Sequence, residues 1–596
     1  MPRTVPEEPA RPRLELAALA ICLAGLAGLA TAIWALKHGA PLPRPAVLAL
    51  LAMTCAPFYV GLVRGPKPLH LLPGLVAVFL LYPIANPHGF VYSRDPLFNY
   101  QFSHILIESD TWIPGSLTGY ARTYSYYPLG NTFLGAVMSA SNLPGPIAYL
   151  WVEPLVRLLA LPAAVYALGR RLFGEKEAAV GLLLYLGTGS ILFNLPVQQG
   201  IGVIFVALSL LALAMITTSK SGEDLRFNAR ALFVLSSAAV VMTHHLSSYF
   251  LAIWLGLVAV IALTPHFREK LRPVRLGGSF LFYLAVLVVY AALLTGPLIL
   301  RQTGTVEDAI SNFIDPGDAS AKPVTLGRTF QLYEIAWLAG SIFLLLVLAL
   351  LARKRLPDTA AGRFVSVTGL VAALLMLATL PMIATSLNFV PLRFSEFANI
   401  VLAPLAAVTL VAWAKGGAFA TKRFIPAALR QKRSLSTIAA VAAVAVIFMG
   451  GQFAPLSLRS YFEAPSARTT DSPLYVGEDA LRAGAWAHDH VNGSRVWSDQ
   501  LGLAAFGSFG EMRVEYGHYR IFRSATMDAS TWAALEVGDY VAVNSRMTTD
   551  RPDFLDNENP TGPITAAAVG KFGGDRHFAA VYSDATFTLY RVMSLP

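Results

Sequence analysis

The chain has 596 residues, of which 55% are hydrophobic and only 14% are charged. Soluble domains carry about 25% charged residues, so this composition excludes an ordinary soluble protein and indicates an integral membrane protein. The formal net charge is +10, but the cations stand in short clusters between apolar runs. Membrane topology produces that pattern, so no nucleic-acid partner is expected.

The chain opens with a polar, proline-rich segment, residues 1–13, which we expect to be a disordered cytoplasmic N-terminus. About thirteen apolar runs follow. We interpret each as a transmembrane helix, because ~20 apolar residues cross the hydrocarbon of a bilayer. Cys22 and Cys55 lie within such runs, so neither a disulfide framework nor a thiolate metal site is expected. The runs lie near residues 14–36, 46–63, 68–86, 147–169, 178–194, 200–217, 230–244, 247–264, 277–300, 331–352, 364–386, 397–414 and 436–454.

The cationic clusters indicate the topology. Alternating the runs from a cytoplasmic N-terminus places every strong cluster on the inner side, as the positive-inside rule expects. We therefore predict a multi-pass protein of the cell (plasma) membrane with its N-terminus inside and its C-terminus outside. The clusters are Arg64/Lys67, Arg170/Arg171, Lys220/Arg226/Arg230, Arg268/Lys270/Arg272/Arg275, Arg353/Lys354/Arg355 and Lys422/Arg423/Arg430/Lys432/Arg433.

Three parts follow from this layout: the N-terminal segment 1–13, a transmembrane domain 14–455 and an extracytoplasmic domain 456–596. In the last part, residues 481–488 have a helical pattern and GSRVWSD a strand pattern, and TWAALEVGDYVAVNS indicates a helix followed by a strand. FAAVYSDATFTLYRV predicts a closing hairpin with its turn at Ser583-Asp584. We expect a small α/β domain there.

The external loop 87–146 is the stretch with the most chemistry. A loop this long between membrane helices is usually functional. Asp95, in SRDPLFNYQ, is placed to act as a general base or to hold a divalent cation. Alternatively, Asp95 caps a helix that has Pro96 at its first position. The neighbouring Arg94 is a candidate substrate-binding residue.

Two further features of this loop have competing interpretations. Glu108 and Asp110 form a carboxylate pair that can hold a hard cation together with Asp95, which leaves Mg²⁺ or Mn²⁺ open as a cofactor. Short acidic pairs are also common on solvated loops. Arg122 and Tyr127, in GYARTYSYYPLGN, are candidates for binding a sugar, whereas a belt of interfacial tyrosines is the alternative.

Charged and histidine residues also occur near the ends of later runs. Glu153 and Arg157 are four residues apart on one helix face, where they neutralise each other or line a substrate path. His244 and His245 point about 100° apart on a helix, so one is expected to face a site; a structural role is the alternative. Arg393 is suited to hold a lipid phosphate through its planar fork of donors, and Glu396 is its substrate-binding neighbour or simply its local ion-pair partner.

At these residues the chain resembles the GT-C superfamily of membrane glycosyltransferases, which includes protein O-mannosyltransferases, the aminoarabinose transferase and the catalytic subunit of oligosaccharyltransferases. The resemblance rests on the polytopic layout, on SRDP in the early loop, on the later YYPLGN, on LRFSEF in a late run and on the tail hairpin. The chain departs from the family in having no Asp-x-Asp motif in the early loop, two additional spans before that loop and no WWDYG-type signature.

The resemblance implies a transferase that moves a sugar from a polyprenyl-phosphate donor to a glycan, lipid or protein acceptor at the outer face. Asp95 would deprotonate the acceptor hydroxyl, and Arg393 would stabilise the phosphate leaving group. His244 or His245 would assist acceptor or phosphate binding. Two other classes stay open from the residues alone: a flippase or transporter of lipid-linked glycans, and a ligase or polymerase of the O-antigen type.

Overall fold

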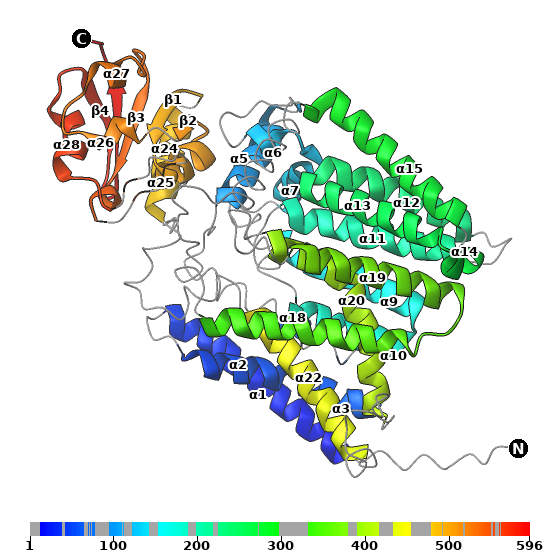
Figure 1. Cartoon of the computed structure of the whole chain (residues 1–596). Coiled ribbons are helices and arrows are strands. Elements are labelled where there is room, and N and C mark those ends of the chain that lie inside the picture. Colours follow the sequence, from blue (N-terminus) through cyan, green and yellow to red (C-terminus); the bar gives the residue numbers. More distant parts are fainter. Residues whose placement is uncertain are drawn as a thin grey trace, which may run out of the picture.

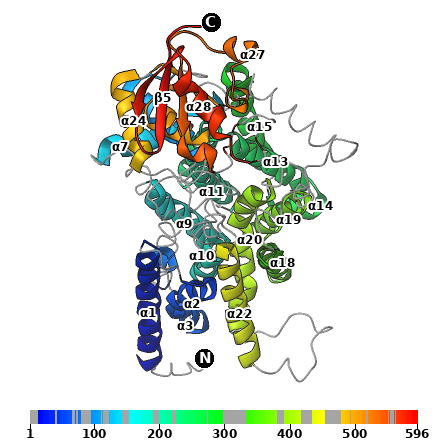
Figure 2. The ribbon, with the colours of Figure 1, turned by 90° about the vertical axis from the view of Figure 1, so that its left-hand side faces the viewer.

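The computed structural model is a helical bundle with a small sheet domain at one end (Figure 1). The C-terminal domain lies beside α5 and α7, and α1, α2 and α22 lie toward the opposite end (Figure 2). The predicted fold class is therefore confirmed in outline: a mostly helical chain with a small C-terminal sheet. The structure describes all residues outside 1–11, 38–41, 65–69, 71, 73, 78–93, 110, 113–121, 142–152, 189–197, 219–224, 272, 297–331, 380–389, 416–432, 454–477, 492, 517–518, 550–551, 553, 555–559 and 561.

The helices of the bundle follow the apolar runs. They are α1 (Pro12–Lys37), α2 (Arg44–Thr54), α3 (Ala56–Arg64), α5 (Arg94–Ser109), α6 (Arg122–Ser125), α7 (Pro128–Ser141), α9 (Glu153–Leu172), α10 (Glu175–Thr188), α11 (Gln198–Thr218), α12 (Leu225–Thr243), α13 (His245–Ala262), α14 (Pro265–Leu271), α15 (Pro273–Tyr290), the π-helix η5 (Ala291–Thr295), α18 (Leu332–Arg353), α19 (Ala360–Thr379), α20 (Val390–Ala414) and α22 (Arg433–Phe453).

Most predicted runs coincide with a helix, with two local differences. The run 46–63 is divided into α2 and α3 at Cys55, and α1 already begins at Pro12, inside the segment predicted to be disordered. The run 68–86 lies largely outside the described residues. Among the described residues, six helices are long and apolar enough to cross a membrane. The thirteen-span count and the orientation stay predictions.

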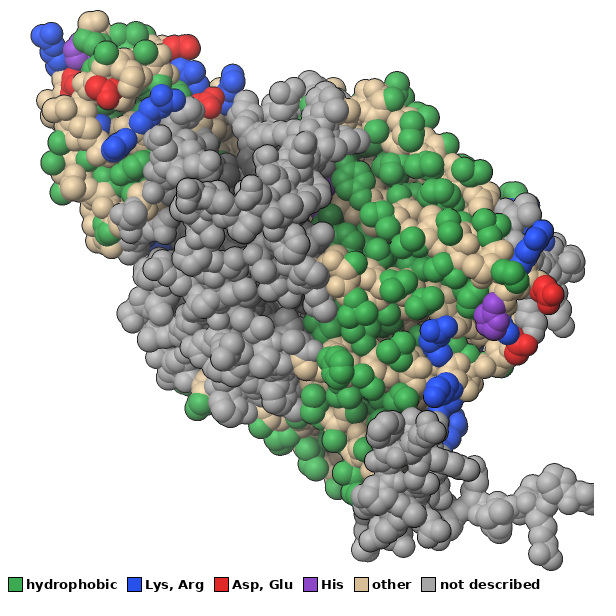
Figure 3. Space-filling model, viewed as in Figure 1, with side chains coloured by type: hydrophobic (Ala, Val, Ile, Leu, Met, Phe, Trp, Pro, Cys, Tyr) green, Lys and Arg blue, Asp and Glu red, His purple; other side chains and the backbone are tan. Residues whose placement is uncertain are grey.

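The helices of the bundle expose an extensive hydrophobic surface. Figure 3 shows hydrophobic side chains over the bundle, whereas charged side chains gather near α14 and on the C-terminal domain. On α15 and η5, the exposed side chains include Leu281, Val288, Val289 and Leu293. An apolar surface of this extent marks contact with lipid or with another protein, and together with the six apolar helices it indicates a membrane protein.

Close packing at the centre of the bundle depends on glycines of α10. A Cβ added to Gly181 would lie 2.6 Å from Pro404 Cα in α20, and one added to Gly187 would lie 2.3 Å from Phe448 Cα in α22. Small residues let helix backbones approach each other in this way. The resulting van der Waals packing holds helices together in lipid, where no hydrophobic driving force acts between them. These contacts bring α10 into the middle of the main hydrophobic core.

This packing makes a stability prediction. Gly187→Ala forces the backbone of α22 away and should lower the free energy of unfolding by about 2 kcal/mol, the typical cost of overpacking a core. Thermal denaturation of the detergent-solubilised protein measures the change. Gly278→Ala in α15 is the matched control, because a Cβ there meets nothing within 4 Å; equal melting temperatures for the two variants would contradict the packing argument.

The C-terminal domain contains a mixed five-stranded sheet in the order β2-β1-β3-β5-β4. β2, β1 and β3 are parallel, while β5 is antiparallel to both β3 and β4. Its elements are α24 (Glu478–Val491), β1 (Arg495–Ser498), α25 (Gln500–Gly502), the π-helix η8 (Leu503–Phe509), β2 (Arg513–Tyr516), α26 (Arg520–Arg523), α27 (Ala529–Trp532), β3 (Tyr540–Asn544), the 3-10 helix η9 (Ser545–Thr548), α28 (Ala566–Gly574), β4 (Phe578–Ser583) and β5 (Phe587–Val592).

The predicted elements of this domain are confirmed, and the closing hairpin has a clear physical basis. Asp584 lies in its turn, where Oδ1 accepts hydrogen bonds from the backbone N–H groups of Thr586 (2.8 Å) and Phe587 (2.7 Å). An aspartate that bonds its own backbone two and three residues ahead favours a tight turn. η8 and β2 were not predicted from the sequence.

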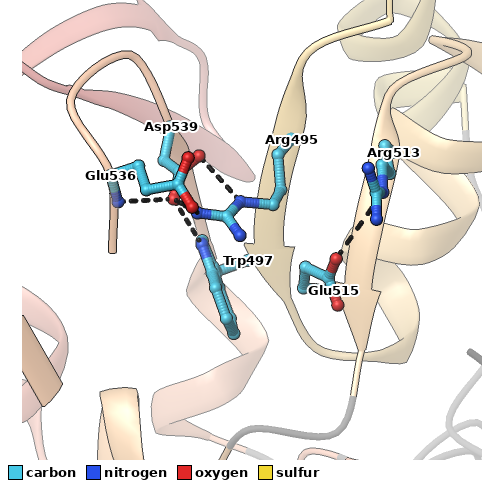
Figure 4. A network of polar contacts seen from close by, with 6 residues as sticks. All are labelled: Arg495, Trp497, Arg513, Glu515, Glu536 and Asp539. Atoms are coloured by element: carbon cyan, nitrogen blue, oxygen red, sulfur yellow. Dashed lines mark hydrogen bonds and ion pairs between the residues drawn. The ribbon is translucent and has the colours of Figure 1, made fainter. Parts of the chain in front are cut away.

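An ion-pair network joins two neighbouring strands of this sheet (Figure 4). Asp539 directly precedes β3. The guanidinium of Arg495 on β1 donates from Nε to Asp539 Oδ1 (2.8 Å) and from Nη2 to Asp539 Oδ2 (2.6 Å). Trp497 Nε1 donates to the same carboxylate over 3.1 Å. Asp539 is buried and raises the pKa of Arg495 by these hydrogen bonds. Bidentate pairs of this kind are strong and directional, so they fix β1 against β3.

The hydrophobic core of the C-terminal domain extends into the bundle. Tyr100 of α5, Leu134 and Met138 of α7, and Ile201 of α11 belong to the same buried cluster as the core residues of α24, β1 and β5. The domain is therefore packed directly on α5 and α7, which lie within the predicted external loop 87–146, and on α11.

Candidate functional site

The predicted catalytic residue lies in the first turn of α5. This helix begins at Arg94, so Asp95 lies within the helix rather than before it as the alternative cap. The side chains of Arg94, Asp95 and Glu108 are outside the described part of the structure, as is Asp110. Their roles stay predictions. Further along α5, the buried Asn99 and Ser103 are joined by a bond from Ser103 Oγ to the Asn99 carbonyl (2.7 Å).

The YYPLGN segment is held by side chains from other helices. Gln198, at the start of α11, donates through Nε2 to the carbonyls of Tyr124 (3.4 Å) and Tyr127 (3.0 Å). The Tyr290 hydroxyl, at the end of α15, donates to the Tyr126 carbonyl (2.6 Å). Pro128 then opens α7, as expected for proline at a helix start. The segment is thereby fixed against α11 and α15.

Tyr127 is buried and faces the histidines. Its ring centroid lies 5.5 Å from that of His245 and 6.3 Å from that of Tyr290. Burial raises the pKa of the Tyr127 phenol well above its ordinary value, so the hydroxyl keeps its proton and can donate a hydrogen bond. The side chain of Arg122, at the start of α6, lies outside the described residues.

The two histidines have different roles. His244 has an extended backbone and caps α13, with Nδ1 accepting from the Ser247 N–H over 3.3 Å. That nitrogen carries no proton in this arrangement. His245 is the first residue of α13 and packs between Tyr127 and Tyr249. His244 thus has a structural role as a helix cap, and His245 is the histidine beside Tyr127; that one of them faces a site stays a prediction.

Arg157 is buried at 1% exposure in α9, and its charge acts on a distant carboxylate. The predicted partner Glu153 has a side chain outside the described residues. Instead, Arg157 and Arg393 both lie close enough for their charges to stabilise the carboxylate of Glu396, which is also 1% exposed. Tyr185 of α10 is near both Arg157 and Glu396.

These residues form a continuous set, which we name the polar ring. Ring contacts join Tyr127 to His245 and His245 to His244. Charge interactions at longer range connect His244 with Arg393, and Glu396 with Arg393 and Arg157. Arg157 packs against Gly200, because a Cβ added to that glycine would lie 2.2 Å from Nη1 of Arg157. Gly200 is two residues after Gln198, whose side chain donates to the Tyr127 carbonyl. The members of the polar ring are Tyr127, Arg157, Gln198, His244, His245, Arg393 and Glu396.

The polar ring combines two guanidinium groups, those of Arg157 and Arg393, with one carboxylate, that of Glu396. Beside the ring, the amide atoms of the buried Gln199 and Asn399 have no hydrogen-bond partner among the described residues. Buried polar groups in native proteins are almost always hydrogen-bonded, so this region is suited to receive a polar, negatively charged group.

Three candidate spans also begin at the polar ring, at Gln198, His245 and Arg393. The N-terminus of a helix carries about +0.5 of an elementary charge and free N–H groups, which favour an anion. The ring therefore lies at the N-terminal ends of three apolar helices.

Sequence reasoning found Tyr127, His244, His245, Arg393 and Glu396 but missed other members of the site. Gln198 and Gln199 open an apolar run, which was the only signal for them. Tyr185, Tyr290 and Asn399 stand inside apolar runs, where a single polar atom has no distinctive pattern. Their role emerges from the packing of the helices alone.

A glycine offers a test of the ring geometry. Gly200→Ala should displace the Arg157 guanidinium without changing any charge, and should lower the activity of the protein about ten-fold or more, because small misplacements of binding groups are costly. Gly340→Ala in α18, where an added Cβ meets nothing within 4 Å, is the control. Unchanged activity in a well-folded Gly200→Ala protein would show that Arg157 is not part of the functional site.

Comparison with known proteins identifies the fold. No protein-family model matches the chain, and no curated protein matches it by sequence. Among solved structures, the Archaeoglobus fulgidus oligosaccharyltransferase in complex with Zn and sulfate has a TM-score of 0.51 at 13% identity, covering 86% of this chain and 79% of that one. The same enzyme tethered with an acceptor peptide gives 0.50 at 12% identity, covering 88% and 79%.

The bound form of ArnT from Cupriavidus metallidurans, with undecaprenyl phosphate, gives a TM-score of 0.48 at 12% identity, covering 87% of this chain and 97% of that chain. At these identities the comparisons show the fold alone. The resemblance to GT-C glycosyltransferases is thus confirmed at the level of the fold.

Proposed function

We propose that this chain is a membrane glycosyltransferase that moves a sugar from a polyprenyl-phosphate donor to a glycan, lipid or protein acceptor at the outer face of the cell membrane. The polar ring is the observation that carries the proposal. It brings two guanidinium groups to the N-terminal ends of apolar helices, which suits a ligand with a phosphate head and a hydrocarbon tail. The fold shared with an oligosaccharyltransferase supports the same class.

In this proposal Arg393 and Arg157 bind the phosphate, and three helix N-termini add to the positive potential. As the bond between the sugar and the phosphate breaks, negative charge grows on the phosphate oxygens. Donors that are already in place stabilise that charge without further rearrangement. The charge of Glu396 helps to orient the two guanidinium groups toward the ligand.

Residues of the early loop activate and bind the acceptor. Asp95, in the first turn of α5, takes the proton from the acceptor hydroxyl as that oxygen attacks the sugar. Tyr127 and His245 offer aromatic faces beside the ring, which suit contact with a sugar. Because Tyr127 is fixed by Gln198 and its neighbour Tyr126 by Tyr290, this surface is formed before the substrate binds.

The first test is Asp95→Asn. Asparagine keeps the size and much of the local hydrogen bonding of aspartate but cannot act as a base. Transfer from a polyprenyl-phosphate sugar in reconstituted membranes should fall about 10²–10⁴-fold, the usual contribution of a general base. Asp489→Asn, on an exposed position of α24, should leave turnover unchanged. A folded and fully active Asp95→Asn protein would contradict the assignment of Asp95 as the catalytic base. A transport assay for lipid-linked glycans would then be the next experiment.

Arg393→Lys tests the donor side separately. Lysine keeps the positive charge but loses the planar fork that binds two phosphate oxygens at once. We expect the KM for the polyprenyl-phosphate sugar to rise about ten-fold, with a smaller effect on folded yield. A change in turnover without any change in KM would place the phosphate elsewhere.

The need for a divalent cation depends on the early loop. Asp95, Glu108 and Asp110 are the candidate ligands for Mg²⁺ or Mn²⁺, and the loop has no Asp-x-Asp motif. We therefore propose that transfer depends at most modestly on divalent cations. The assay is transfer after treatment with a chelator. A complete loss of transfer that manganese or magnesium restores would contradict this proposal and make those carboxylates the ligands.

A further inference from the structure

Glu511 connects the C-terminal domain to the helix of the early loop. Its carboxylate forms an ion pair through Oε1 with Nδ1 of His104 on α5. The other oxygen, Oε2, lies 3.5 Å from Nδ1 of His488 on α24. The Glu511 side chain is only 9% exposed, so the contact is largely shielded from water. One buried carboxylate therefore bridges two imidazoles that come from different parts of the chain.

The backbone of Glu511 is held in an unusual conformation. Its φ of 55° makes it the one non-glycine residue with positive φ in the described part of the chain. Glycine adopts this region freely, whereas other residues pay a steric cost. The preceding Gly510 lies against α24, since a Cβ there would come within 2.8 Å of the Ala487 Cβ. A glutamate that remains at such a position points to a role for its side chain.

The surrounding contacts between α5 and the domain are apolar. Tyr100 packs edge-on against Phe509, with ring centroids 5.4 Å apart, and Phe102 is buried against Leu503 of η8. Apolar contacts favour association without fixing its register, because they are not directional. The ion pair of Glu511 with His104 is directional and lies at the same junction.

We propose that Glu511 is a positioning residue through which the C-terminal domain holds α5 in place, with His104 and His488 as its two partners. Other polar groups nearby are engaged elsewhere: His490 Nδ1 contacts the Trp486 carbonyl at 2.8 Å, and Arg513 pairs with Glu515 at 3.7 Å. Asp95 lies about 14 Å along the helix axis from His104, at the ~1.5 Å rise of each residue. A shift of α5 at His104 therefore moves the turn that carries Asp95.

Hydrogen–deuterium exchange on the full-length protein tests the proposal without an activity assay. In Glu511→Gln, the amides of α5 should exchange about ten-fold faster, as expected for the loss of a charge-assisted hydrogen bond. Amides of β3 and β5 should not change. Glu515→Gln on β2, which removes a carboxylate from a more exposed ion pair, is the matched control. Equal exchange of α5 in the two variants would overturn the proposal.

Glu511→Gly separates the side chain from the backbone conformation. If position 511 serves only the left-handed turn, glycine relieves the steric cost, and both the domain and α5 should become more protected. If Glu511 positions α5, glycine should protect the turn around residue 511 while α5 exchanges faster, as in Glu511→Gln. The first result would overturn the proposal and the second would support it.

A kinetic measurement extends the test and rests on the proposed transferase function. Glu511→Gln should lower turnover with little change in the KM for the donor, because it acts on α5 and not on Arg393. Faster exchange of α5 with unchanged turnover would support the positioning role and count against a catalytic role for α5. Slower turnover without faster exchange would overturn the positioning role.

Discussion

The arrangement of the membrane domain depends on placing two arginines and one glutamate together inside apolar helices. A charge buried away from water is costly unless a partner compensates it. Arg157 and Glu396 are each only 1% exposed, and the charge of Arg157 on α9 acts on Glu396 of the neighbouring α20. The two guanidinium groups are the feature that the proposed function assigns to an anionic ligand.

The packing around the polar ring follows from this requirement. Gly200 provides the space for the Arg157 guanidinium, and Gly181 and Gly187 let α10 approach α20 and α22 at backbone distance. His244 caps α13 with its side chain and so starts that helix beside Arg393. Of these residues, Gly200 contacts a charged group of the ring directly, whereas Gly181 and Gly187 set the spacing of the helices around it.

Much of the fold could be predicted from the sequence, because apolar runs and strand patterns reflect local physics. The helices of the bundle and the closing hairpin around Asp584 are of this kind. The site could be predicted in part, since Arg393 and His245 are conspicuous at the ends of apolar runs. The influence of Arg157 on Glu396 could not, because the two residues are far apart in the sequence and approach each other only through tertiary packing. Gln198 carries no local signal at all.

The helix α5 of the early loop packs on the C-terminal domain as well as on the bundle. α5 packs on the bundle through Tyr100, which shares a cluster with Leu134 and Ile201, and on η8 through Phe102 and Leu503. A helix enclosed on both sides has little freedom to move alone, so the turn with Asp95 is positioned by the bundle and by the domain together. The donor side, around Arg393, is built from membrane helices only. The two halves of the proposed reaction therefore rest on different supports, and contacts such as that of Glu511 can adjust one without altering the other.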